Sequence, residues 1–158
     1  MKVYTLERQT VLNTSLEKAW EYFSRPENLN EITPDDMQFR ILTDVTGKKM
    51  HAGMIINYRI QPAPFMNFGW TTEISHCEDH HFFVDEQRFG PYAFWHHQHI
   101  FEDKGDHVLM TDIVNYAMPF GFIGRIAHAV WVKHKLSGIF DYRTTVINRV
   151  FPNHSNHS

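Results

Sequence analysis

The longest amphipathic pattern in the chain lies near its C-terminus, from Phe122 to Phe151. Apolar residues recur there at close to the 3.6-residue period of an α-helix, and Pro152 ends the run. The apolar positions are Ile123, Ile126, Ala127, Val130, Leu136, Ile139, Phe140, Val146, Ile147 and Val150. The polar positions between them are Arg125, His128, Lys133, Lys135, Arg143 and Arg149. The pattern predicts one helix of about 40 Å, at about 1.5 Å per residue, with one face on a sheet and the other in solvent.

A two-residue alternation dominates most of the remaining chain and predicts seven β-strands. The expected strands span 2–12, 39–44, 54–60, 68–75, 82–89, 94–101 and 108–116. Gln61 to Asn67 is predicted to be a loop, because Pro62 and Pro64 cannot donate hydrogen bonds to a ladder. The later connections are short, and short links between successive strands predict an antiparallel meander.

Two short helices are expected between the first strand and the second. Ser15 is a good N-cap for a helix that begins at Leu16 and stops before Pro26, and residues 27–32 can form the second. The resulting order is strand, two short helices, six strands and one long helix, which is an α+β fold. We expect a single domain, residues 1–152, and a disordered polar tail, residues 153–158.

This order of elements resembles the helix-grip fold of the START-like (SRPBCC) superfamily, in which a curved seven-stranded antiparallel sheet surrounds the C-terminal helix. The stretches that carry the resemblance are 14–23 (TSLEKAWEYF), 26–29 (PENL), 32–34 (ITP), 83–87 (FVDEQ), 90–92 (GPY), 95–99 (WHHQH), 112–116 (DIVNY) and 119–121 (PFG). The superfamily includes polyketide cyclases, Bet v 1-like plant ligand binders and lipid carriers. The later stretches are similar to a bacterial subgroup loosely called cell-division-inhibitor-like. The resemblance implies a cavity between sheet and helix, although one fold of this kind serves carriers, enzymes and regulators.

Composition narrows the function classes. The 158 residues suffice for one domain with an internal pocket, and the 15% aromatic content suits an apolar lining. A net charge of -3 implies no general affinity for nucleic acid. The single cysteine, Cys77, excludes an internal disulfide and fits a reducing compartment. No signal-like segment and no long apolar run is present, so we expect a cytoplasmic protein without stable membrane insertion.

Strand alternation selects a candidate ligand-binding set on the face toward the long helix. Seven strand residues make up this set: Asp85, Gln87, Trp95, His97, His99, Asp112 and Tyr116. Each shares a face with bulky apolar residues, and the resemblance marks the same positions. A register slip of one residue would turn all of them outward. On the long helix, Ser137 and Gly138 are small enough to leave space above the sheet, and we add Ser137 and Asp141 to the set.

The chemistry of this set centres on two histidines between two aspartates. His97 and His99 with Asp85 and Asp112 can form a satisfied ladder that fixes the sheet, a polar end wall for a ligand, or an acid–base pair for catalysis. The same two histidines with one aspartate could ligate zinc. Twelve histidines make coincidental spacings common, however, so we predict neither a metal nor another cofactor.

The favoured function is the binding or carriage of a small apolar or amphipathic ligand, such as a lipid, an isoprenoid or a polyketide-like molecule. One alternative is a cyclase or dehydratase that uses His97 or His99 with Asp85 or Asp112. A second is a regulator that acts by protein interaction, and a homodimer is left open. We favour a binding protein over an enzyme.

Overall fold

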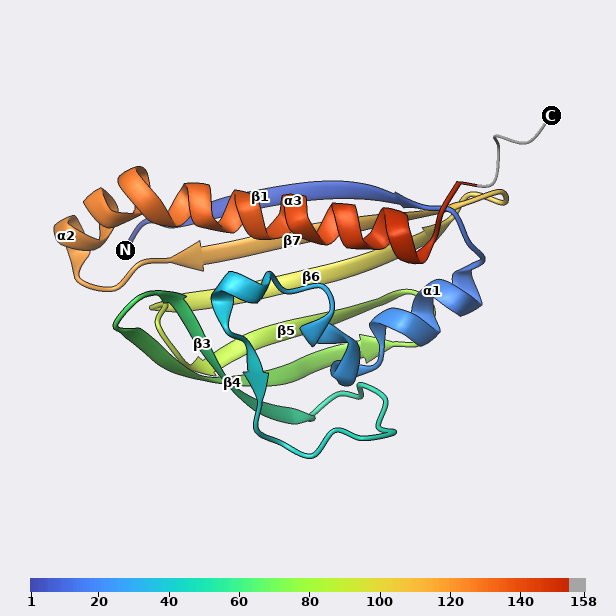
Figure 1. Cartoon of the computed structure of the whole chain (residues 1–158), viewed down its shortest axis with the longest axis horizontal. Coiled ribbons are helices and arrows are strands. Elements are labelled where there is room, and N and C mark those ends of the chain that lie inside the picture. The colour runs from blue at the N-terminus through green and yellow to red at the C-terminus, as the bar shows by residue number, and fades with distance from the viewer. Residues whose placement is uncertain (154–158) are drawn as a thin grey trace.

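In a computed structural model of the chain, which describes residues 1–153, a seven-stranded antiparallel sheet curves around the C-terminal helical segment (Figure 1). The strands are β1 (Val3–Leu12), β2 (Arg40–Ile41), β3 (Ile55–Ala63), β4 (Met66–Glu78), β5 (Phe82–Phe89), β6 (Phe94–Asp103) and β7 (Val108–Ala117). Their order is β1-β7-β6-β5-β4-β3-β2, a meander from β2 to β7 that β1 completes at one edge. The predicted helix-grip architecture is confirmed. The predicted tail lies outside the described residues, apart from Asn153.

Two strand predictions are corrected. The predicted loop of Gln61 to Asn67 is a tight hairpin, because β3 continues to Ala63 and β4 begins at Met66. An irregularity in register between Ile60 and Ala63 accommodates Pro62 without a ladder hydrogen bond. The predicted strand 39–44 is only two residues long, because the Leu42 and Thr43 N–H groups both donate to the Asn57 carbonyl and end the regular pairing.

The short helices follow the predicted signals. Helix α1 (Leu16–Phe23) is capped by Ser15, whose Oγ accepts the Lys18 N–H at 3.4 Å. The second predicted helix is a 3₁₀ turn, η1 (Pro26–Asn30), and another 3₁₀ turn, η2 (Asp35–Met37), follows it. A 3₁₀ geometry is common in such short connectors.

The C-terminal helical segment is continuous but is not one regular α-helix. It consists of α2 (Gly121–Ala127), a π-helical turn η3 (His128–Val132) and α3 (Lys133–Val150). A π turn changes the phase of the helix, because each turn contains more residues. As a result His128, predicted to be solvated, is buried, while Val130, predicted to face inward, is 72% exposed. Among residues 1–153, no helix has the length and hydropathy that a membrane span requires.

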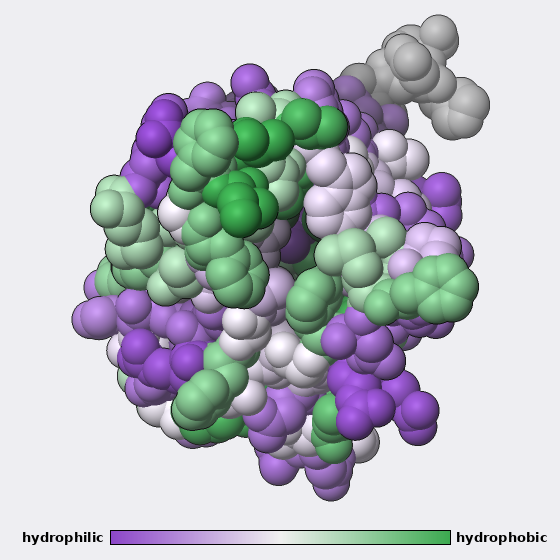
Figure 2. Space-filling model, turned by 90° about the vertical axis from the view of Figure 1, so that its left-hand side faces the viewer, coloured by the Kyte–Doolittle hydropathy of each residue, from purple (hydrophilic) through white to green (hydrophobic). Residues whose placement is uncertain are grey.

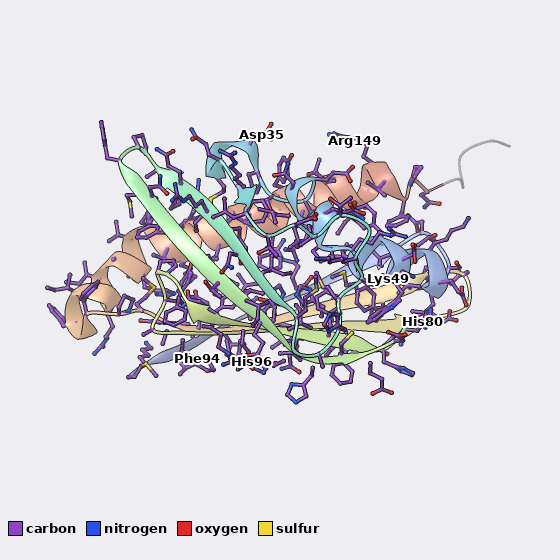
Figure 3. All side chains as sticks on the ribbon, turned by 90° about the horizontal axis from the view of Figure 1, so that it is seen from below. Asp35, Lys49, His80, Phe94, His96 and Arg149 are labelled. Carbon is purple, nitrogen blue, oxygen red and sulfur yellow. The ribbon has the colours of Figure 1, made fainter. Side chains whose placement is uncertain are left out.

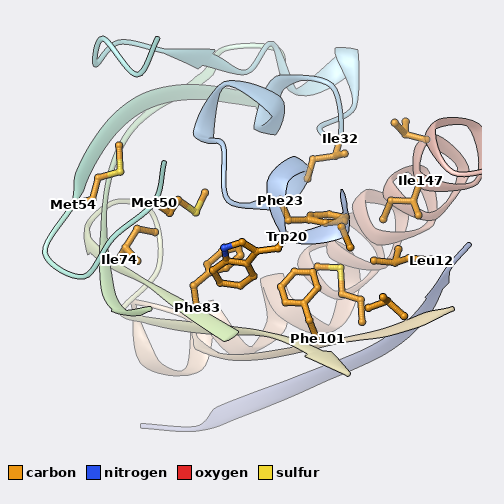
Figure 4. Close-up of a cluster of buried hydrophobic side chains, with 14 of the residues drawn as sticks. Leu12, Trp20, Phe23, Ile32, Met50, Met54, Ile74, Phe83, Phe101 and Ile147 are labelled. Atoms are coloured by element: carbon orange, nitrogen blue, oxygen red, sulfur yellow. The ribbon is translucent and has the colours of Figure 1, made fainter. Parts of the chain in front are cut away.

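A solid apolar core closes the end of the molecule where α1 covers the sheet (Figure 4). Trp20 of α1 meets Phe101 edge to face with ring centroids 5.5 Å apart, and Phe83 at 6.1 Å. Ile147 of α3 is 1% exposed in the same cluster. Because these side chains fill the space under the C-terminal half of α3, any open volume must lie toward α2.

The burial pattern confirms the predicted register of β6 and β7. His97 and His99 are each 4% exposed and Asp112 is 1% exposed. Phe94 and His96 of the same β6 point away from the helix, on the outer face of the sheet (Figure 3). The period of two therefore turned the histidine pair toward α3.

Candidate functional site

A cavity of about 400 Å³ lies between the concave face of the sheet and the C-terminal helical segment. This volume falls within the range of small-molecule pockets in proteins, about 300–1,000 Å³. Its sheet side is lined by packed aromatic rings: Trp70 contacts Trp95 at 5.2 Å, Tyr92 at 5.5 Å and Tyr58 at 5.6 Å between ring centroids. Its helix side is lined by Leu136, Ile139 and Phe140. The interior is therefore mostly apolar.

The mouth of this cavity is at the α2 end. Figure 2 looks onto that end and shows a hollow bordered by apolar residues. Phe120 and Ile123 line the cavity and are 81% and 72% exposed. Gly124 lets α2 fold back over the preceding loop, since a Cβ there would lie 1.9 Å from the Pro119 carbonyl oxygen. The mouth thus presents an apolar entrance to solvent.

Two histidines and two aspartates form a polar end inside the cavity. His97 Nε2 lies 2.8 Å from Asp112 Oδ1, and His99 Nε2 lies 2.7 Å from Asp85 Oδ2. The other ring nitrogens lie near the opposite carboxylates, with His97 Nδ1 3.3 Å from Asp85 Oδ2 and His99 Nδ1 3.1 Å from Asp112 Oδ1. Only the two Nε2 contacts have hydrogen-bond geometry, and His99 Nδ1 is buried without a hydrogen-bond partner. His97 is therefore hydrogen-bonded to β7 and His99 to β5, and each ring also lies close to the carboxylate of the other strand.

Two further donors hold the carboxylates. The Trp95 indole N–H donates to Asp85 Oδ1 at 3.1 Å, and Arg143 Nη1 donates to Asp112 Oδ1 at 3.3 Å. Arg143 comes from α3 and also lies over the Phe140 ring, 4.8 Å from its centroid. The polar end is thereby connected to the helix as well as to the sheet.

The charges in this cluster favour ionised carboxylates and a protonated His97. Burial opposes the ionised form of Asp85, but His97 and His99 outweigh it and lower the pKa of that carboxyl. Burial likewise opposes ionised Asp112, while the hydrogen bond from His97, the adjacent His99 ring and the Arg143 charge lower the pKa of Asp112. Burial also disfavours the His97 imidazolium, but the Asp85 charge and the Asp112 hydrogen bond raise the pKa of His97.

These shifts predict a stability maximum in mildly acidic solution. The contribution of His97 is complete below its ordinary pKa of 6.5 and is lost as the pH rises through the higher pKa of the folded state. The contributions of Asp85 and Asp112 are complete above their ordinary pKa of 3.8 and are lost as the pH falls. The melting temperature should therefore be highest between these two values and should fall as the pH rises above 6.5. Melting curves of the protein and of His97→Gln across this pH range provide the test. The assignment to His97 would be contradicted if the melting temperature of the wild-type protein fell no more steeply with rising pH than that of the variant.

Asp85, His97 and His99 place possible metal-ligand atoms within 4.8 Å of one another. The His99 Nε2–Asp85 Oδ2 distance of 2.7 Å is that of a hydrogen bond, and His97 Nδ1 lies 3.3 Å from the same oxygen. A tetrahedral zinc ion about 2.0–2.2 Å from each nitrogen and oxygen ligand would hold neighbouring ligand atoms about 3.3–3.6 Å apart. His99 and Asp85 would therefore have to separate to hold a metal ion together.

The structure brings part of the predicted ligand-binding set to the cavity wall. Asp85, Trp95, His97 and His99 line the cavity, and Asp112 lies directly behind the two histidines.

Two other predicted strand residues hold the surrounding backbone and helix. Gln87 braces the turn before β6, because its amide donates to the Tyr92 carbonyl at 2.7 Å and accepts the Tyr92 N–H at 3.1 Å. The Tyr116 hydroxyl lies 2.8 Å from His128 Nε2 and so anchors the π turn. Neither residue lines the cavity.

The two predicted helix residues, Ser137 and Asp141, do not lie at the cavity. Asp141 is exposed and pairs with Arg8 of β1 at 2.6 Å, and Ser137 is absent from the lining. Gly138 is exposed, with no atom close to the position of a Cβ, so its small size opens no space above the sheet. The helical phase turns these residues away from the concave face.

Arg143 is the main site residue that the sequence interpretation missed. It was assigned to the solvated face of the helix, yet its side chain is only 12% exposed and lines the cavity. A signal was present, since Arg143 follows Leu136 by seven residues and Phe140 by three, which places all three on one helical face. The prediction followed the charge of Arg143, which favours solvent, and not its position on the apolar face of the helix.

Comparisons with known proteins support the fold. No protein-family model matches the chain, and no curated protein matches it. Among solved structures, major latex-like protein 151 from Panax ginseng superposes with a TM-score of 0.68 at 15% identity, covering 96% of this chain and 99% of that one. Truncated norcoclaurine synthase from Thalictrum flavum gives a TM-score of 0.67 at 13% identity, covering 96% of each chain. Protein CV1439 from Chromobacterium violaceum gives 0.71 at 9% identity, covering 94% of this chain and 98% of that one.

The chain therefore has the Bet v 1-like helix-grip fold that the sequence predicted. The likeness covers nearly the whole of each chain, so the sheet and the long helix together match the fold of those structures. The bacterial cell-division-inhibitor-like subgroup stays a prediction.

Proposed function

We propose that this protein binds a small, mostly apolar ligand in the cavity between the sheet and α3, with the polar group of the ligand at the His–Asp cluster. The observation that carries the proposal is the cavity itself: about 400 Å³, an aromatic and aliphatic lining, and one polar end with charged groups. Such a combination is typical of sites that bury a ligand and fix its orientation with a few polar contacts.

The distribution of packing supports this proposal over a purely structural role for the cluster. The aromatic core around Trp20 and Phe101 is already packed at the α1 end of the molecule. The cavity lies toward the other end, beside this core. A void without occupant forfeits packing contacts, which a ligand would restore. A norcoclaurine synthase of the same fold is described in complex with a transition-state analogue, so the architecture can serve a small-molecule site.

Native mass spectrometry of freshly purified protein, followed by extraction and mass analysis, tests the proposal directly. A copurifying small molecule in about one-to-one amount is the expected result. A neutral fluorophore such as N-phenyl-1-naphthylamine provides a second test, because its emission rises when it enters an apolar pocket. Folded protein that neither carries a small molecule nor binds the fluorophore would overturn the proposal.

Replacing Ile139 with tryptophan should block the cavity. Ile139 lines it from α3, and the larger side chain would occupy ligand volume, so affinity for N-phenyl-1-naphthylamine should fall by at least about tenfold, or about 1.4 kcal/mol. Val130→Trp is the matched control, because Val130 belongs to the same helical segment but is 72% exposed and outside the lining. Equal affinities for the two folded variants would place the fluorophore elsewhere.

Proton transfer to the bound ligand is a second candidate function. It is favoured by one observation: His97 and His99 both line the cavity and both bond to carboxylates, the arrangement that orients a catalytic imidazole. Incubation of the extracted ligand with fresh protein, followed by mass and absorbance, tests it. If the ligand is converted, and if His97→Gln and His99→Gln abolish this turnover but still bind the ligand, the protein is an enzyme. A ligand that stays unchanged would favour a carrier.

A further inference from the structure

Arg143 is the charged group at the polar end whose hydrogen-bonding capacity is least used. A guanidinium group has five N–H donors. Within residues 1–153, the one hydrogen bond assigned to this group is that from Nη1 to Asp112, at 3.3 Å, and Nε is buried without a partner. The side chain lines both the main cavity and a small adjoining void of about 10 Å³ beside His99. A buried donor without a partner is costly, so an acceptor at this position would stabilise the site.

Three of the four neighbouring carboxylate oxygens, by contrast, already accept hydrogen bonds. Asp85 Oδ1 accepts from Trp95, and Asp85 Oδ2 accepts from His99 with His97 Nδ1 3.3 Å away. Asp112 Oδ1 accepts from His97 and Arg143. A ligand hydroxyl that donates would have to compete with these hydrogen bonds at three of the four oxygens. A ligand group that only accepts hydrogen bonds matches the donors that remain.

The charges of the cluster limit the charge that a bound acceptor can carry. Asp85 and Asp112 are two buried carboxylates, and Arg143 is the group with a permanent positive charge beside them. A dianion such as a phosphate monoester would bring two further negative charges next to these carboxylates in a buried place. A single negative charge spread over two oxygens is the smallest addition that can pair with the planar guanidinium through two hydrogen bonds.

We infer that the ligand is an amphipathic monocarboxylate whose carboxylate binds Arg143 at the deep end of the cavity and whose apolar body extends toward the mouth. This inference rests on the proposed function and specifies its ligand class. Phe120 and Ile123 at the mouth would surround the far end of the apolar body, because they line the cavity there and are exposed. The carboxylate enters first and the tail stays near solvent.

The test compares decanoic acid with 1-decanol, which differ in the head group and share the chain length. Each displaces N-phenyl-1-naphthylamine from the protein at about pH 7, where decanoic acid is ionised. Wild-type protein should bind the acid at least about tenfold more tightly than the alcohol, as expected for a charge-assisted contact. Arg143→Met should lose this preference and bind the two with similar affinity.

Arg8→Met is the matched control. Arg8 also pairs with an aspartate, Asp141 of α3, but on the outside of the molecule, so the preference for the acid should persist in this variant. Arg143→Lys keeps the charge without the planar fork and should retain only part of the preference. If Arg143→Met does not fold, the wild-type comparison together with Arg143→Lys still decides the question.

The outcomes separate this inference from the proposed function. Equal affinities for acid and alcohol in wild-type protein that binds the fluorophore would overturn the inference and leave the proposed function standing. The inference also fails, with the proposed function intact, if Arg143→Met or Arg143→Lys keeps the full preference for the acid. Folded wild-type protein that binds none of the three molecules would overturn the proposed function as well.

Discussion

Replacing Asp112 with alanine is expected to lower the free energy of unfolding by about 3–5 kcal/mol, the usual cost of removing one partner of a buried ion pair. Asp112 is 1% exposed and accepts from His97 at 2.8 Å and from Arg143 at 3.3 Å. Its loss would leave both cations without this counter-charge between the sheet and α3. For a chain of this size, the melting temperature should fall by about 6–20 °C.

Urea unfolding at a pH below 6.5, where His97 is charged in the folded protein, gives the cleanest measurement of the Asp112→Ala effect. Asp141→Ala is the control, because Asp141 also pairs with an arginine, Arg8, but its side chain is 66% exposed. An exposed pair contributes about 0–1 kcal/mol, so this variant should unfold close to the wild-type midpoint. Comparable losses from the two substitutions would show that burial does not set the strength of the Asp112 contacts.

Replacing Phe83 with alanine is expected to cost about 3–5 kcal/mol of stability and also to loosen the polar end of the cavity. Phe83 is 3% exposed, meets Trp20 of the core edge to face at 6.1 Å, and stacks on the His99 ring at 4.1 Å between centroids. Its removal would leave a void between the solid core and the cavity, which Phe83 also lines. The same substitution should therefore lower the melting temperature and widen the pocket.

Thermal unfolding and titration with N-phenyl-1-naphthylamine measure these two effects of Phe83→Ala separately. Phe65→Ala is the control for stability, because Phe65 lies fully exposed at the β3–β4 turn and its loss should change the unfolding free energy by less than about 0.5 kcal/mol. A stable Phe83→Ala variant would mean that the core and the polar end of the cavity do not depend on a shared aromatic contact.

Much of the fold could be predicted because local sequence signals mark where its helices and strands begin and end. Ser15 and Pro26 bracket α1, and the alternation from residue 82 onward reproduces β5 at both of its ends. The exceptions have identifiable causes. Pro62 led to the prediction of a loop, but β3 accommodates this proline at an irregularity in its register with β4. A helical period of 3.6 cannot reveal a π turn, so the interpretation placed Val130 inward and His128 outward, the reverse of their positions.

The candidate site shows the same division. Alternation, shared bulky apolar neighbours and the family resemblance together placed His97, His99 and Asp112 toward the helix, and the structure confirms their burial. They could not tell which nitrogen would bond to which carboxylate, because those bonds depend on how β5, β6 and β7 align side by side. Arg143 was missed and Asp141 was wrongly included, since both depend on the exact rotation of α3 over the sheet.

By itself the sequence determined the order of the elements, the meander, and the inward face of the central strands, because periodicity and turn residues act between neighbours along the chain. Only the tertiary structure decided that a cavity remains beside the aromatic core, and that His97, His99, Asp85, Asp112 and Arg143 meet at its inner end. These features arise where residues distant in sequence pack together. Strand register, sheet curvature and helical phase fix them jointly, and no local pattern contains that information.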